Sequence, residues 1–158
     1  MAWFPKNPPV VLKCSPFRGA GHMSSVRLGP MTTTKMKAIV QTDPQERRSL
    51  ELQEVDVPQL QSGEVLVKVQ AAGVNRGDIL QTMGAYPPPP GASEILGLEA
   101  AGTIADAGDT DWEVGTDVGC LLAGGGYAEY VAVPQGQLLP VPKGLSVEET
   151  AAVVEVCL

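Results

Sequence analysis

The side chains best suited to hold a small molecule lie within residues 63–102. Asn75 carries a carboxamide that both donates and accepts hydrogen bonds, and Tyr86 offers a ring and a hydroxyl. Together these two side chains could orient a polar ligand and stack on a flat one. From the residues alone, Asn75 fits equally well as the cap of a following helix. Asp78 and Glu99 are expected to have supporting structural roles.

The chain offers few other reactive groups. His22 is the only histidine, and the three cysteines, Cys14, Cys120 and Cys157, have no paired spacing. A disulfide framework is therefore not expected, and a reducing compartment fits best. Cys120 lies in an apolar run and is interpreted as a small buried hydrophobic residue.

Local patterns predict the elements that position Asn75 and Tyr86. Residues 65–70 alternate with period two, as in a half-buried strand. A short helix should follow Asn75, with Asp78 in its first turn and Gly84 at its end. The four prolines at 87–90 predict a stiff exposed loop, and residues 98–107 read as the next strand.

Further short strands are predicted on both sides of this segment. They begin at Met36 and cover residues 50–57, 117–122, 127–133 and 137–141. Residues 124–126 are three glycines followed by a strand, so they predict a turn rather than a phosphate-binding loop. Ser146 and Glu149 form a capping box that should open a final helix of about three turns. Many short strands and little helix indicate a mainly β fold, a small barrel or curled sheet.

Composition and charge narrow the class of protein. The chain has 158 residues, enough for one ordinary domain, and a net charge of −7 that disfavours nucleic-acid binding. No apolar run reaches the roughly 20 residues that cross a bilayer, so no membrane association is expected. Residues 1–35 are basic, proline-rich and free of acidic residues, and we predict a disordered extension there. A mitochondrial targeting role for it is the alternative to a cytoplasmic protein.

Three stretches in order, GEVLVKVQAAGVNRGD, YPPPPGAS and ILGLEAAG, resemble the medium-chain dehydrogenase/reductases. The resemblance extends from Met36 to about Val156 and is strongest to the zeta-crystallin-like, zinc-independent quinone oxidoreductases. It implies a GroES-like, partly open β-barrel with short helices over residues 36–150. Residues 151–158 would then begin the connection to a Rossmann domain that this chain does not include.

The resemblance implies that Asn75 and Tyr86 are the catalytic residues. Zinc-containing relatives carry a cysteine and a histidine ligand where this chain has Asn75 and Leu98, and neither replaces those donors, so no metal is expected. NADPH is the implied cofactor, with Asn75 contacting its nicotinamide ribose or carboxamide. Tyr86 matches the second of two substrate-side tyrosines, and the first is Leu80 here.

The leading hypothesis is therefore the substrate-side domain of an NADPH-dependent quinone oxidoreductase, acting on quinones or other conjugated carbonyl compounds. Alone it should be inactive, because hydride donor and acceptor must be positioned together. The full-length form is expected to be a dimer. Two alternatives stay open: a non-catalytic module that binds or modulates a partner, and an enone or enoyl reductase.

Overall fold

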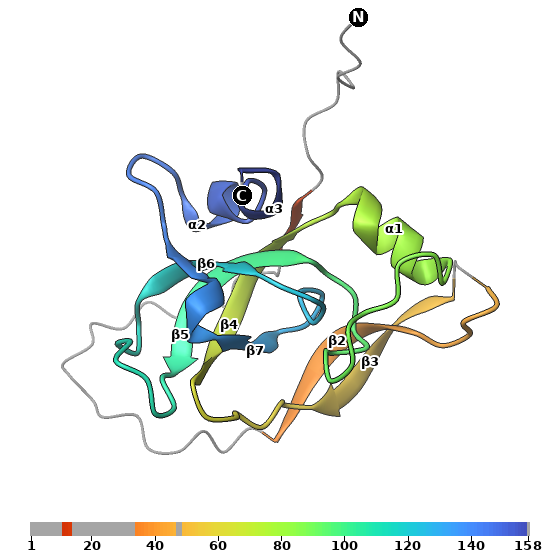
Figure 1. Ribbon diagram of the computed structural model, residues 1–158, viewed down its shortest axis with the longest axis horizontal. Helices are drawn as coiled ribbons and strands as arrows, with labels where there is room; N and C mark the ends of the chain where they lie inside the picture. Colours follow the sequence, from red (N-terminus) through yellow and green to blue (C-terminus); the bar gives the residue numbers. More distant parts are fainter. Residues whose placement is uncertain (1–10, 14–33, 47–48, 158) are drawn as a thin grey trace, which may run out of the picture.

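The computed structural model describes residues 11–13, 34–46 and 49–157, and its main body is a curled antiparallel sheet (Figure 1). The strand order is β1-β4-β5-β6-β8, with β7 also paired to β4. The bounds are β1 Val11–Lys13, β4 Glu64–Gly73, β5 Glu99–Asp106, β6 Asp117–Leu121, β7 Tyr130–Pro134 and β8 Leu138–Pro140.

Strand β4 organises this sheet. One edge of β4 pairs with β5, while the other edge pairs first with β7 and then, at Ala71 to Gly73, with β1. Val65, Val67 and Val69 are buried and Lys68 and Gln70 are exposed, as period two predicts, but Leu66 is buried as well. Core residues around them are valine, alanine, leucine, isoleucine and Cys120, with Trp112 and Tyr127 only at the margin. The prediction of a mainly β fold with a curled sheet is confirmed.

A hairpin of β2 (Lys35–Gln41) and β3 (Leu50–Asp56) forms a second sheet beside the first. The hairpin is joined to the segment before β7, because Ile39 N–H donates to Tyr127 O and Glu129 N–H donates to Lys37 O. Only a small cluster of Met36, Ala38 and Ala128 is buried beneath it. Strand β3 is exposed along nearly its whole length.

The helices are short. α1 covers Arg76–Thr82, as the caps at Asn75 and Gly84 predict, and a 3-10 turn covers Gln135–Gln137. α2 (Val147–Thr150) and α3 (Val154–Cys157) lie together against β5 and β6 (Figure 1). In the part of the chain that the structure describes, no helix is long and apolar enough to cross a membrane.

Two sequence predictions need correction. The final helix is not continuous: after Ala151 the hydrogen bonds shift to the tighter i−3 pattern, and Glu155 N–H donates to the Glu99 side chain instead of Ala151 O. Strand β7 begins at Tyr130 rather than residue 127, because the preceding three residues bend to reach β2. Within residues 1–35, Val11–Lys13 form β1, which the sequence did not predict. The strand predicted from Met36 is β2, and it begins one residue earlier, at Lys35. Most of the remaining residues of this segment lie outside the described part.

Candidate functional site

Asn75 lies where β4 ends and α1 begins, and it has two structural tasks. It is the extended N-cap of α1, and its backbone N–H donates to Asp78 Oδ2 at 2.7 Å, one bond of a capping box. The Asn75 side chain also reaches β5, since Nδ2 donates to Glu99 Oε1 at 2.8 Å. Asn75 therefore caps α1 and at the same time holds its amide nitrogen against Glu99.

Glu99 is the first residue of β5, and only 2% of it is exposed. Gly73, the last residue of β4, lies directly against its carboxylate, and a Cβ at position 73 would collide with Oε1. The glycine therefore provides the space in which a buried carboxylate reaches Asn75.

Asp78 and Tyr127 extend this group of polar residues. Tyr127 Oη donates to Asp78 Oδ2 at 2.8 Å, and Asp78 is only 3% exposed. Burial, and then the Asp78 carboxylate, raise the pKa of Tyr127 far above its ordinary value, so its hydroxyl stays protonated. Asp78 Oδ1 and Gln81 Oε1 are buried without a hydrogen-bond partner.

Leu98 precedes Glu99 and is buried beneath α1, where Gly77 leaves room for its side chain. An amide at 75 and an isobutyl group at 98 are poor ligands for zinc. Among the described residues, no three His, Cys, Asp or Glu side chains are grouped so as to hold a metal ion.

Tyr86 lies apart from this polar group. It is 52% exposed, on the loop after α1, and Ile79 and Met83 of the α1 region are exposed as well. Leu80, which replaces the other expected tyrosine, is half-buried. The structure thus places Asn75 in a fixed hydrogen-bonded setting and Tyr86 on an open, largely apolar surface.

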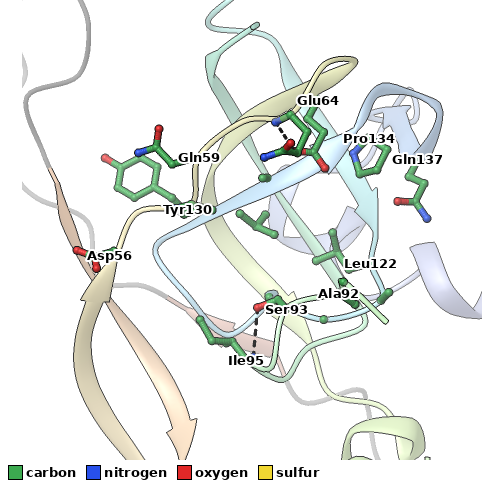
Figure 2. Close-up of a pocket in the computed structure, with 18 of the residues that line it drawn as sticks. Asp56, Gln59, Glu64, Ala92, Ser93, Ile95, Leu122, Tyr130, Pro134 and Gln137 are labelled. Atoms are coloured by element: carbon green, nitrogen blue, oxygen red, sulfur yellow. Dashed lines mark hydrogen bonds between the residues drawn. The ribbon is translucent and has the colours of Figure 1, made fainter. Parts of the chain in front are cut away.

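A cavity of about 480 Å³ lies between the β2–β3 hairpin, residues 91–95 and β7 (Figure 2). Neither Asn75 nor Tyr86 lines it. Its two acidic lining residues have partners: Asp56 pairs with Lys35 at 2.8 Å, and Glu64 Oε2 accepts from Gln61 N–H. Both carboxylates of the cavity, Asp56 and Glu64, thus already have partners, and we assign the candidate site to the Asn75 region.

The glycine turn at 124–126 is not built for a phosphate. Gly125, Gly126 and Tyr127 donate their N–H groups to the carbonyls of Ile95, Gly97 and Leu96. These amides would be the donors of a phosphate cradle, so the prediction of a turn holds. The described residues do not form a dinucleotide-binding fold.

The curled antiparallel sheet with short helices is the architecture of a GroES-like domain. The sequence model of the Alcohol dehydrogenase GroES-like domain matches residues 61–143. The chain belongs to this family and, through it, to the medium-chain dehydrogenase/reductases.

Individual relatives agree with this assignment. The synaptic vesicle membrane protein VAT-1 homolog of Danio rerio is 37% identical over 97 residues, which are 60% of this chain and 20% of that protein. Quinone oxidoreductase of Mus musculus is 36% identical over 102 residues, or 63% of this chain and 31% of that protein. The solved quinone oxidoreductase of Thermus thermophilus, also studied in complex with NADPH, has a TM-score of 0.55 and 36% identity, covering 73% of this chain and 35% of its own. This chain thus spans about a fifth to a third of these relatives.

Two contributors to the site were not assigned from the sequence. Tyr127 follows a glycine turn, and the only local signal was an aromatic residue expected at the start of a strand. Glu155 contributes through its backbone N–H to Glu99, which lies 56 residues away. A contact between residues so far apart in the chain leaves no periodicity or spacing in the sequence from which it could be predicted.

Proposed function

We propose that this chain is the substrate-side domain of an NADPH-dependent quinone oxidoreductase. In this function Asn75 orients the reacting groups, and Tyr86 provides a surface for a flat conjugated carbonyl compound. The cofactor would be bound by another domain, with Asn75 contacting its nicotinamide ribose or carboxamide. NADPH supplies the hydride in such a reaction, and this chain's residues bind and orient.

The observation that carries the proposal is the fixed carboxamide of Asn75 next to an apolar Leu98. An amide and an isobutyl group are poor ligands for a metal ion that would act as a Lewis acid. The site therefore suits an acceptor that spreads its own negative charge and needs no such ion. Quinones and enones are such acceptors. Ile79 and Met83 of the α1 region are exposed apolar side chains, as is Tyr86 on the following loop, and such side chains suit a flat ring system.

Binding can be tested on the chain alone. Titration of the isotope-labelled protein with 9,10-phenanthrenequinone should shift the NMR signals of Asn75 and residues near Tyr86. Asn75→Ala should weaken binding by roughly five- to tenfold, the loss of about one hydrogen bond. Gln53→Ala is the matched control, because it removes an exposed amide from β3. Shifts confined to the cavity of Figure 2 would contradict the assignment.

Turnover needs a second test. The chain alone should not oxidise NADPH with a quinone, whereas a fusion to the nucleotide-binding domain of mouse quinone oxidoreductase should do so. Quinones, enones and enoyl thioesters should be compared as acceptors in that fusion. Preferential turnover of an enoyl thioester would favour the enoyl reductase alternative over the proposed function. Quinone binding without turnover in a folded fusion would favour a binding module.

A further inference from the structure

Glu99 is a buried carboxylate whose two oxygens accept from two different segments. Oε1 accepts from Asn75 Nδ2 at 2.8 Å, and Oε2 accepts from the backbone N–H of Glu155 at 2.8 Å. The first donor belongs to the turn before α1, and the second belongs to α3. One side chain therefore bridges the candidate site and the last helix.

The bridge changes the course of the chain at α3. In a continuous helix, Glu155 N–H would donate to Ala151 O, but it donates to Glu99 instead. The N–H groups at the start of a helix lack intrahelical partners, so a carboxylate is a favourable acceptor there. The break between α2 and α3 thus follows from a contact that also fixes Asn75.

The position of Glu99 is itself strongly constrained. Its backbone is paired with Leu121 of β6, and its carboxylate lies against Gly73. Gly119 of β6 in turn faces Thr150 of α2 and Val154 of α3, which keeps both helices close to the sheet. Because Glu99 is held in place by the sheet, we expect a movement of α3 to change the hydrogen bond between Glu155 N–H and the Glu99 carboxylate.

We infer that Glu99 is a positioning residue that couples the placement of α3 to the orientation of the Asn75 carboxamide. Its significance for ligand binding depends on the proposed function, whereas the coupling is a property of the chain itself. Whatever displaces or anchors α3 changes how firmly Asn75 is held. In a reductase of the proposed kind, docking at α3 would then hold the Asn75 carboxamide more firmly in the substrate site.

The coupling can be tested by removing one N–H group. Glu155→Pro deletes the N–H that donates to Glu99, and Glu155→Ala is its control, because it keeps the N–H. In the labelled full chain without ligand, Glu155→Pro should shift the Asn75 side-chain amide signals and speed their hydrogen exchange by roughly five- to tenfold. Glu155→Ala should leave them unchanged. Identical Asn75 signals in parent and Glu155→Pro, or equal changes in both variants, would overturn the inference.

A second variant tests Glu99 directly. Glu99→Gln has one accepting oxygen where the carboxylate has two, so either the Asn75 amide or the Glu155 N–H should lose protection. Glu129→Gln is the control, because Glu129 Oε2 accepts Lys37 N–H at 2.8 Å in another part of the protein. Full protection of both groups in folded Glu99→Gln would also overturn the inference. If Glu99→Gln does not fold, Glu155→Pro decides. Neither measurement includes a quinone, so their outcome is independent of the binding test above.

Discussion

Asn75 meets Glu99 through a single donor and acceptor pair, and this pair makes the identity of residue 75 critical. Nδ2 is 2.8 Å from Glu99 Oε1, and Glu99 is buried. Aspartate has the same shape as asparagine but offers only acceptors when ionised. The choice of an amide rather than a carboxylate at this position is therefore a requirement of the buried Glu99.

Asn75→Asp should consequently destabilise the fold by about 1–3 kcal/mol at neutral pH, because two carboxylate oxygens would face each other without a proton. Urea unfolding measures this loss. Stability equal to that of the parent would argue against a direct contact between residues 75 and 99.

Tyr127 is the only side chain in the described residues whose hydroxyl is seen donating to Asp78. Tyr127→Phe removes that donor while the ring stays in place, and Asp78 Oδ1 already lacks a partner. We expect a loss of about 1–3 kcal/mol in urea unfolding. Tyr130→Phe serves as the control because Tyr130 is also half-buried. Equal stability of parent and Tyr127→Phe would show that the bond is replaced by water.

At the scale of elements, the loops before β4 and after β5 are joined by Asp109. Ser62 Oγ and Gly63 N–H donate to its two carboxylate oxygens at 2.6 and 2.7 Å. The Ser62 hydroxyl, followed by the Gly63 N–H, lowers the pKa of Asp109 from 3.8. A lowered folded-state pKa contributes stability above the unfolded value, and this stability is lost as the pH falls through the folded value.

Asp109→Asn should therefore lower the urea midpoint at pH 7, and the difference from the parent should disappear as the pH falls below 3.8. Asp111→Asn is a suitable control, because Asp111 is exposed in the same loop. A difference that persists undiminished in acid would mean that the charge of Asp109 does not matter.

How far the sequence predicts the elements depends on the range of the interactions that determine them. Period two in residues 65–70 and the caps at Asn75 and Gly84 predict β4 and α1, because those signals are local. The prediction of one continuous final helix was wrong, because the Glu155 N–H donates to Glu99 and not to Ala151 O as the local pattern predicts. Asn75 was a candidate from its residue type, but its buried partner Glu99 was assigned only a supporting role, since its contacts depend on the sheet.

At the scale of the whole molecule, the two sheets differ in how much apolar surface they bury. The β4–β5–β6 sheet encloses the large cluster that contains Val65, Val67 and Ile104. Among the described residues, the cluster at the β2–β3 hairpin has three buried members, Met36 and Ala38 of β2 and Ala128, and Leu52 of β3 is 64% exposed. Local opening requires less free energy where less apolar surface is buried.

Amide hydrogens of β2 and β3 should therefore exchange at least about tenfold faster than those of β4 and β5, which corresponds to an opening free energy lower by about 1.4 kcal/mol. Hydrogen exchange followed by NMR gives both sets in one experiment. Ala128→Gly, which trims the small cluster, should speed exchange in the hairpin and leave β5 almost unaffected. If both sheets exchanged at the same rate and responded together to Ala128→Gly, the molecule would open as a single unit. The hairpin would then be as firmly bound as the sheet that positions Glu99 and Asn75.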